Sequence, residues 1–348
     1  MTTQAGKPSQ SPERRTRRGS GSITLSDVAK MAGVSAITAS RAVNTPEQVS
    51  PDTLKRVRDA IERTGYVPNM LAGGLASSRS RLVAALVPTI AGPVFLETVQ
   101  ALTESLAAEG YQVMLGQSGY TGAREDALLD AIIGRRPDGI VLTGVMHSSV
   151  GRKRLLASGI PVVETWDLTP TPIDMLVGFS HEKVGAAVAA CLIAQGRKRV
   201  AIVTADDHRA LLRQDAFVAE AKRLGCKSVP ISVVPAPSTL GSGRAGLVEL
   251  LAKTDEIDAV FCSSDVLAHG VITEAQARGL AVPEKLAVFG FGDLAFARDT
   301  HPALTTVRID GTAIGRQSAK FILARTRGES IAARVIDLGF TIVERAST

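Results

Sequence analysis

Residues 25–44 read LSDVAKMAGVSAITASRAVN, and this stretch decides how the chain is organised. Apolar residues recur at helical spacing on both sides of Gly33, which predicts two short helices joined by a tight turn. Glycine adopts the positive φ that such a turn requires without a steric penalty. Ser26 and Ser35 are expected to cap the two helices, because a serine hydroxyl accepts hydrogen bonds from N–H groups of the first turn. The pattern predicts a helix-turn-helix.

The outer face of the second predicted helix carries residues suited to contact DNA. Such a helix fits the major groove of B-DNA with its N-terminal residues against the base edges. Arg41 can bond a guanine through two N–H groups, and Ile37 can contact a thymine methyl group. The alternative is an ordinary helical hairpin with a solvated arginine. The candidate DNA contacts in this part of the chain are Thr24, Leu25, Ser35, Ala36, Ile37, Thr38, Ser40, Arg41, Asn44 and Tyr66.

Positive charge is concentrated at the N-terminal end. Residues 1–81 hold 13 of the 40 Lys and Arg but only 6 of the 34 Asp and Glu, so this end carries a net charge of +7. A cationic end is what a nucleic-acid-binding segment requires. Residues 1–22 have almost nothing to bury and predict a disordered basic tail. Its arginines between positions 14 and 18 either touch DNA phosphates or form a solvated arm.

A third helix is predicted after Ser50-Pro51, a capping serine followed by a first-turn proline, and it ends at Gly65. Three helices over residues 23–68 would complete a DNA-binding headpiece, and residues 69–81 would form a hinge. The hinge sequence NMLAGGLAS has helical spacing, but each of its two central glycines costs about 1 kcal/mol relative to alanine. We expect this helix to form only on DNA. The alternative is a flexible linker without a DNA contact.

The pattern changes at Leu82, where LVAALVP begins a series of buried strands that alternate with helices. This alternation predicts a parallel sheet covered by helices. It restarts at Leu176, so residues 82–348 are expected to form two doubly wound subdomains. The fold class is therefore an all-α headpiece followed by an α/β core. The strands expected near residues 306–309 and 336–341 are not assigned to either subdomain.

Several classes of protein are disfavoured. No stretch approaches the roughly 20 apolar residues of a membrane span, and the polar N-terminus lacks the apolar segment of a secretory signal. Three dispersed cysteines without CxxC spacing indicate neither a disulfide frame nor a metal site. Phosphate-loop, GxGxxG, HExxH and GxSxG motifs are absent, which disfavours an enzyme. We expect a cytoplasmic protein without a cofactor, a metal or a membrane partner.

TLSDVAKMAGVSAITASRAVN at 24–44, with VS at 49–50 and GYVPN at 65–69, resembles the headpiece of the lactose-repressor (LacI/GalR) family. Further segments resemble its gluconate-repressor branch: NTPEQVS at 44–50, GY at 119–120, GIPVVE at 159–164 and DLGFT at 337–341. The resemblance implies a homodimer on a DNA operator and a periplasmic-binding-protein-like core that binds an effector. It also implies a hinge leucine that wedges into the minor groove. Asn69 and Leu75 are the matching candidate contacts.

Ligands of doubly wound sheets bind beyond the carboxyl ends of the strands, and the resemblance points to the same loops. The candidate effector contacts are Phe95, Tyr120, His147, Trp166, Arg213, Asp265 and Asp293. Aromatic faces with convergent polar groups suit a sugar-like ligand. Many relatives have a hydroxyl-gripping aspartate at Gly292, and losing that acid while having Arg213 and His147 favours a sugar acid such as gluconate.

Each charged candidate also has a plainer interpretation. Arg213 could be a surface arginine of a helix, Asp265 a helix cap and His147 an exposed loop residue. For the whole chain, the prediction is a dimeric transcriptional repressor that responds to a small-molecule effector. The alternative is a periplasmic-type sugar-binding protein without a DNA function. Such a protein needs an export signal, which residues 1–22 do not resemble.

Overall fold

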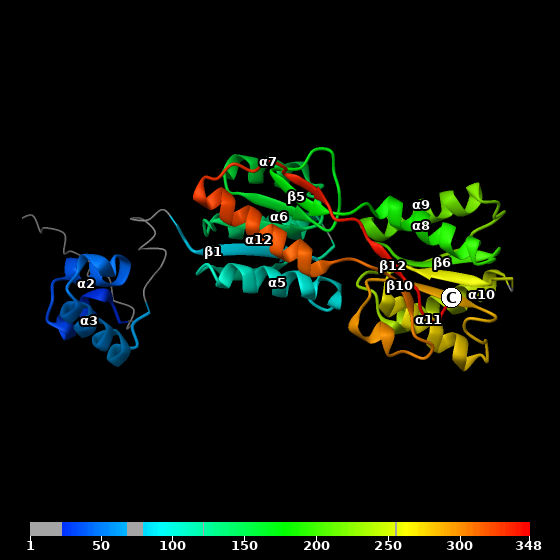
Figure 1. The fold of residues 1–348 in the computed structure, drawn as a ribbon, viewed down its shortest axis with the longest axis horizontal. Helices are drawn as coiled ribbons and strands as arrows, with labels where there is room; N and C mark the ends of the chain where they lie inside the picture. Colours follow the sequence, from blue (N-terminus) through cyan, green and yellow to red (C-terminus); the bar gives the residue numbers. More distant parts are fainter. Residues whose placement is uncertain (1–22, 68–78, 121, 255) are drawn as a thin grey trace, which may run out of the picture. The chain divides into compact units, whose positions relative to one another are not determined.

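The computed structural model describes residues 23–67, 79–120, 122–254 and 256–348 (Figure 1). The chain divides into two compact units between Ser78 and Arg79. The predicted basic tail and most of the predicted hinge, including Asn69 and Leu75, lie outside the described residues. Among the residues that are described, no helix is long and apolar enough to cross a membrane.

The headpiece, described from residue 23 to residue 67, consists of three α-helices and one short 3₁₀ helix. They are α1 (Leu25–Ala32), α2 (Ala36–Asn44), η1 (Pro46–Gln48) and α3 (Pro51–Thr64). Val28, Val57 and the small residues Ala32, Ala42 and Ala60 form its core. Because these side chains are short, the three helices pack closely around very few apolar groups.

The ends of the headpiece helices are fixed by short polar side chains. Gly33 ends α1 with a φ of 65°, and Ser35 caps α2 by accepting the Thr38 N–H at 3.1 Å, which confirms both predictions. The prediction that Ser26 caps α1 is wrong. Thr24 precedes the helix, and its N–H donates to the Asp27 carboxylate at 2.9 Å. Ser26 is already the second residue of α1.

The first subdomain of the core is a six-stranded sheet in the order β11-β5-β4-β3-β1-β2. Its strands are β1 (Leu82–Val87), β2 (Gln112–Gln117), β3 (Gly139–Thr143), β4 (Val162–Thr165), β5 (Met175–Gly178) and β11 (Val335–Asp337). Its helices are η2 (Pro93–Phe95), α5 (Leu96–Ala107), α6 (Gly122–Ile133), α7 (Ser149–Ser158) and α12 (Gly311–Arg327). Alternate residues of β1 face the cluster that includes α5 and α12 and the cluster that includes α6 and α7, so both faces are covered.

The second subdomain repeats this plan with the sheet order β12-β10-β9-β8-β6-β7. Its strands are β6 (Val200–Ala205), β7 (Ile231–Val234), β8 (Ala259–Cys262), β9 (Ala287–Phe291), β10 (Thr305–Arg308) and β12 (Thr341–Val343). Its helices are α8 (His181–Ala194), α9 (His208–Arg223), α10 (Leu240–Lys253), α11 (Asp265–Ala277) and η3 (Ala295–Arg298). All pairings are parallel except that of β10 with β12.

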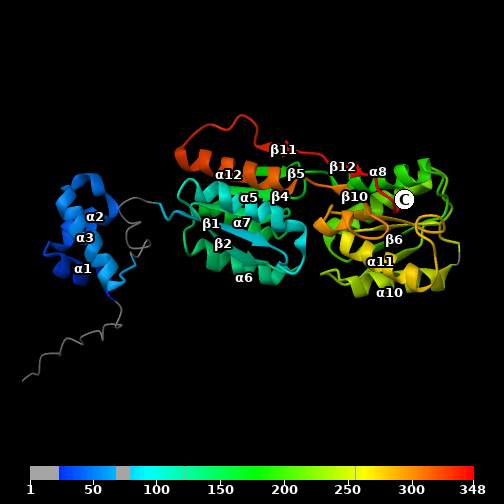
Figure 2. The same cartoon turned by 60° about the horizontal axis from the view of Figure 1, so that its bottom comes forward.

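The chain passes between the subdomains three times, after β5, after β10 and after β11 (Figures 1 and 2). The prediction that the second subdomain begins with a strand at Leu176 is wrong, because β5 pairs with β4 and β11 in the first sheet. The sequence period could not reveal this, since a buried parallel strand looks the same in either sheet. The late strands left unassigned are β10 in the second sheet and β11 in the first.

Candidate functional site

The outer face of α2 exposes the residues predicted to contact DNA bases. Ala39 and Ala42 are buried on its inner face, whereas Ala36, Ile37 and Arg41 are exposed. Ile37 leaves 67% of its surface in water, although burying such a side chain is worth about 1.5–3 kcal/mol. A helix with one face packed and an apolar group and a cation on the other has the form of a major-groove reader.

Polar side chains at both ends of α2 are held by local hydrogen bonds. The Ser35 and Thr38 hydroxyls lie 2.8 Å apart at its N-terminus, where N–H groups and the helix dipole favour a phosphate. Asn44 donates to the Ser40 carbonyl oxygen at 3.0 Å. Of the other candidates, Thr24 is exposed at the start of α1, while Leu25 and Tyr66 pack against the headpiece core.

In the core, a cavity of about 90 Å³ lies between loops of the two subdomains. The first subdomain contributes Thr89, Phe95, Tyr120 and Trp166 to its lining, and the second contributes His181, Asp207, Arg209, Arg213, Ser263 and Phe291. The structure therefore brings together four of the predicted effector residues, Phe95, Tyr120, Trp166 and Arg213. Of the rest, Arg209, Ser263 and Phe291 belong to the stretches expected after predicted strands, although Arg209 lies in α9 and Phe291 ends β9, but His181 was missed.

Aromatic rings form the wall on the side of the first subdomain. Phe95 and Trp166 meet edge to face with ring centroids 5.1 Å apart. The Trp166 indole N–H donates to the Thr98 hydroxyl at 3.0 Å, which fixes the ring. Trp166 has a φ of 65°, a conformation that costs a bulky residue free energy and that clusters at functional sites. This wall offers apolar surface to a ligand.

Arg213 is a buried cation at the opposite side of the cavity, with 5% of its surface exposed. Its guanidinium lies 2.8 Å from His181 Nδ1, donates to the Ser263 carbonyl oxygen at 3.0 Å and stacks on Phe291 at 3.9 Å. Its Nε has no partner, and no described carboxylate forms an ion pair with it. Burial lowers the pKa of Arg213 to about 10. The side chain is charged and dehydrated, and the carboxylates of Asp207 and Asp167 act on it only without an ion-pair contact.

Gly185 allows Arg213 to occupy this position. A Cβ at residue 185 would lie 2.1 Å from the Arg213 carbonyl oxygen, so only glycine lets α8 pack this closely on α9. The interpretation of Arg213 as a surface arginine is therefore wrong. Its helix is amphipathic, and the arginine lies on the face that is packed inward.

His181 links the two walls of the cavity. Arg213 can only donate hydrogen bonds, so His181 Nδ1 accepts, and its Nε2–H donates to the Trp166 carbonyl oxygen at 2.9 Å. Burial, and then the charge of Arg213, lower the pKa of His181 well below its usual value. The ring is neutral and connects the second subdomain to the Trp166 turn. A sequence signal for it existed, because His181 follows the strand residues of β5 by three positions.

Arg209 is a second cation of this cleft. Its guanidinium carbon lies 5.1 Å from the centroid of the Phe95 ring, and it donates to the Thr143 carbonyl oxygen at 3.3 Å. Its contact with Asp207 is long, at 3.9 Å. Both arginines come from α9, so the second subdomain supplies the positive charge while the first supplies most of the aromatic surface.

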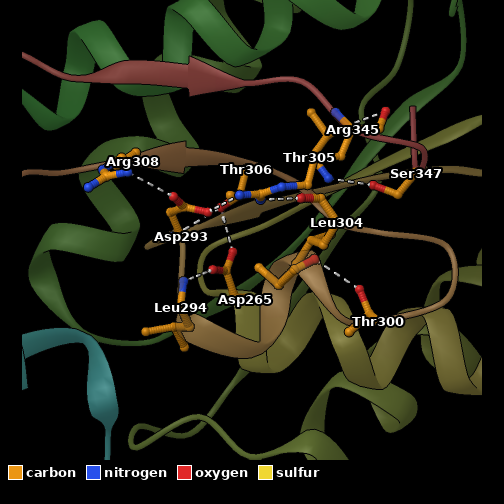
Figure 3. Close-up of polar contacts among 11 residues, drawn as sticks. Asp265, Asp293, Leu294, Thr300, Leu304, Thr305, Thr306, Arg308, Arg345 and Ser347 are labelled. Carbon is orange, nitrogen blue, oxygen red and sulfur yellow. Dashed lines mark hydrogen bonds and ion pairs between the residues drawn. The ribbon is translucent and has the colours of Figure 1, made fainter.

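Asp265 and Asp293 do not line this cavity, although both were predicted to contact the effector. Asp265 accepts the Thr306 hydroxyl at 2.5 Å and the Leu294 N–H at 2.7 Å (Figure 3). Asp293 accepts from Arg345 at 2.6 Å. Their oxygens hold the second subdomain together. Asp265 is not a cap either, because Ser264 precedes α11 and caps it.

His147 lies outside the Arg213 cavity, in an adjoining cavity of about 640 Å³. The two cavities share Tyr120, Asp207 and Arg209. The His147 ring is exposed, and its centroid lies 4.4 Å from that of His208. An effector contact of His147 therefore requires a ligand that extends from one cavity into the other.

Comparisons with known proteins agree with this architecture. The pattern of a family described as bacterial regulatory proteins, lacI family, matches residues 24–69, and that of a periplasmic binding protein-like domain matches residues 189–348. The HTH-type transcriptional regulator GntR of Pseudomonas aeruginosa is 39% identical over 95% of this chain and 97% of its own length. GntR of Escherichia coli K12 is 33% identical over 91% and 96%.

A solved structure matches the chain across both units. It is a LacI-family transcriptional regulator from Silicibacter pomeroyi, 30% identical, with a TM-score of 0.88 over 93% of this chain and 99% of its own. The predicted fold class, the resemblance to GntR-type regulators and the exclusion of an enzyme are confirmed by these relatives. The chain belongs to the LacI family of bacterial regulatory proteins and is a DNA-binding transcriptional regulator.

Proposed function

We propose that the protein represses transcription as a homodimer on a DNA operator, and that a sugar acid such as gluconate binds in the Arg213 cavity and alters operator affinity. The observation that carries this proposal is the state of Arg213, which is buried, has an unpartnered Nε and forms no ion pair with a carboxylate of the described residues. Buried charges are costly unless they are paired. A ligand carboxylate would supply the missing anion.

The surroundings of Arg213 suit the remainder of a sugar acid. Phe95 and Trp166 offer apolar faces to C–H groups, while Ser263 and Thr89 offer hydroxyls. The cavity of about 90 Å³ is small beside the ligand sites of roughly 300–1,000 Å³ that are usual in proteins. A sugar acid would therefore place its carboxylate near Arg213 and extend its hydroxylated chain toward Tyr120 and the adjoining cavity.

Exposed apolar residues of the first subdomain support a dimer. Ile90, Leu96 and Leu115 expose 61%, 55% and 46% of their surfaces. Leu115 lies on β2, the edge strand of the first sheet, where unpaired backbone groups and apolar side chains favour association. Two headpieces held by such a dimer would read the two half-sites of a near-palindromic operator. Because the chromosome is the target, the protein would act in the cytoplasm.

Ligand contacts come from both subdomains, so binding would favour one relative arrangement of them over another. An effector shifts such an equilibrium only by its difference in affinity for the two arrangements. Coupling of the cleft to the headpieces would run through the hinge, for which Asn69 and Leu75 remain the predicted DNA contacts.

The test uses two ligands that differ only in the carboxylate, the group that the proposal pairs with Arg213. Operator binding is measured by fluorescence anisotropy with a palindromic duplex, during titration with gluconate or with glucitol, the polyol that has an alcohol in place of the carboxylate. Gluconate is expected to change the operator dissociation constant, and glucitol is expected to have no effect. Equal effects of both ligands, or an effect of neither, would contradict the proposed effector class, whereas failure to bind any duplex would contradict DNA binding itself.

A further inference from the structure

Three side chains with metal-binding groups meet at the border of the cleft, outside the Arg213 cavity. His147 follows β3, Asp167 follows β4, and His208 is the first residue of α9 in the second subdomain. Each offers one ligand atom, and the three atoms lie within 4.8 Å of one another. The cluster therefore contains residues of both subdomains, and all three line cavities that are open to ligands.

Asp167 is held in place by its backbone. A Cβ at Gly178 would lie 1.9 Å from the Asp167 carbonyl oxygen, so the loop is pressed directly onto β5. The strained backbone of Trp166 comes immediately before it. The position of the Asp167 carboxylate is thus fixed by the fold, as it must be in a pre-formed ligand site.

The Asp167 carboxylate has no ion pair with a cation of the described residues. Its side chain is buried, with 6% exposed, and one oxygen accepts the Leu168 N–H at 2.8 Å. Within the described ranges it has no other hydrogen-bond donor, and the nearby Arg209 makes its ion-pair contact with Asp207 instead. Burial raises the pKa of the Asp167 carboxyl, as expected for a dehydrated anion without a partner. The second oxygen is available to a cation.

The two imidazoles are available as well. Their ring centroids lie 4.4 Å apart at an interplanar angle of 69°, and among the described groups neither ring has a hydrogen-bond partner. Burial, followed by the neighbouring His208 and Arg209, lowers the pKa of His147. Two imidazoles and a carboxylate form a donor set that zinc and similar transition-metal ions prefer.

Charges around the cluster do not exclude a cation. Arg209 and Arg152 oppose one, and so does the positive N-terminal end of α9, where His208 lies. Carboxylates of both subdomains line the same cavities, namely Glu125, Glu182, Asp206 and Asp207. These four carboxylates outnumber the two arginines and offset their effect.

We propose that His147, Asp167 and His208 bind one divalent transition-metal ion of the zinc type and that this ion ties the two subdomains together across the border of the cleft. Ligands of a tetrahedral ion lie about 3.4 Å from one another when each is about 2.1 Å from the metal. The donor atoms already lie within 4.8 Å of one another, and both histidines are exposed, so small rotations of their rings bring the atoms to that spacing. The fourth position remains for water or for a ligand oxygen.

The experiment measures metal binding by untagged, metal-free, full-length protein with Zn²⁺ in calorimetry and Co²⁺ in visible absorption. One equivalent is expected to bind, with cobalt bands typical of a low-coordinate site. The variants His147→Ala, Asp167→Asn and His208→Ala are each expected to weaken Zn²⁺ binding about 10- to 100-fold or more. His269→Ala, which removes a histidine of α11 outside the cluster, is the matched control and is expected to bind like the parent protein.

The readouts separate the possible failures. If Zn²⁺ affinity decreases in the first-subdomain variants His147→Ala and Asp167→Asn but not in His208→Ala, the proposed bridge between the subdomains is overturned. Equal zinc affinity in all variants, or no saturable binding by the parent protein, would overturn the site. Each variant's thermal unfolding is compared with that of the metal-free parent, and His208→Gln, which preserves size and polarity on the exposed end of α9, replaces His208→Ala if that protein is unstable. Because metal affinity is measured without DNA or effector, the result does not depend on the proposed function.

Discussion

The headpiece and the core each carry an arginine that is central to the proposed function, and the two side chains lie in opposite surroundings. Arg41 is exposed on a helix whose other face packs against a small core. Arg213 is enclosed between Phe291, His181 and the Ser263 carbonyl group, and it has no ion pair with a carboxylate of the described residues. An exposed arginine stays hydrated in the free protein and therefore carries no desolvation cost before it binds DNA. A buried arginine carries that cost in the free protein until a ligand anion pairs with it.

This difference explains why the two sites are built differently. The headpiece places its DNA contacts along one local stretch, so caps and turns suffice to position them. The cleft assembles its residues from both sheets, and each loop is positioned by contacts far away in the sequence. Variants that alter either arginine, or the contacts around it, test whether the contrast between an exposed and a buried charge is correct.

The largest effect is expected from Arg213→Met, which keeps the length of the side chain and removes its charge. Truncating one partner of a buried charge pair typically costs about 2–5 kcal/mol, so gluconate should bind about 30-fold more weakly or worse. Calorimetry measures ligand affinity, and anisotropy measures operator affinity in the absence of ligand, which should not change. The matched control Arg298→Met removes an exposed arginine of the same subdomain. Ligand binding that survives Arg213→Met would place the effector elsewhere.

Asp265 tests the free-energy cost of burying a negative charge, as Arg213 does for a positive one. Burial raises its pKa from 3.8 to about 6, so the folded protein binds this proton more tightly than the unfolded chain does. The stability that protonation provides is present below about pH 4 and is lost as the pH rises through about 6, by up to about 3 kcal/mol.

Asp265→Asn should remove this dependence, because the amide does not titrate. The difference in urea midpoint between the parent protein and the variant should therefore decrease as the pH rises from about 4 to about 7. The Asp265 carboxylate accepts from Thr306 with one oxygen and from Leu294 with the other. Asparagine has the same side-chain shape, but an NH₂ donor replaces one of these two acceptor oxygens. A difference in midpoint that stays constant across this range would show that Asp265 is ionised throughout in the folded state.

Arg41→Ala tests the exposed arginine. If Arg41 bonds a guanine, its removal should cost about 1–3 kcal/mol at one operator base pair and relax the preference there. Anisotropy with operators substituted at each position measures this. Arg58→Ala removes an exposed arginine of α3 and serves as the control for net charge. A uniform loss for all sequences would reduce Arg41 to a phosphate contact.

The smallest effect concerns the cap that holds the DNA-reading unit in shape. Thr24→Ala removes the hydroxyl bonded to Asp27 and should destabilise α1 by about 1 kcal/mol, whereas Ser26→Ala should have an effect below about 0.5 kcal/mol. Hydrogen exchange of the α1 amides in the full-length protein measures both. An equal effect of the two substitutions would restore Ser26 as a contributor to the helix end.

The headpiece was largely predictable because its signals are local. Gly33, Ser35 and the alanines of α2 specify a turn, a cap and a packed face within twenty residues of sequence, and the structure places them as predicted. The cap of α1 was missed by two positions, since threonine and serine stand close together there and both are good caps.

The cleft was predictable only in part, because its residues meet through the fold. Residues after the strands were correctly expected to gather, and Phe95, Tyr120, Trp166 and Arg213 do so. Asp265 and Asp293 were expected there as well, but Thr306 and Arg345, which come from distant strands and the C-terminal segment, bind their oxygens. His181 was missed although it follows the residues of β5, and β5 itself was assigned to the wrong sheet. No sequence pattern reports such pairings.

The three passages of the chain between the subdomains have a consequence for biosynthesis. The first subdomain lacks α12 and β11 until residues 311–337 have been translated. Most of the second subdomain is synthesised before these residues. Until then α5 lacks the partner that packs so closely on it that a Cβ at Gly315 would lie 2.4 Å from the Thr98 carbonyl oxygen. A nascent chain on the ribosome therefore exposes this apolar surface, and the two halves mature together rather than one after the other.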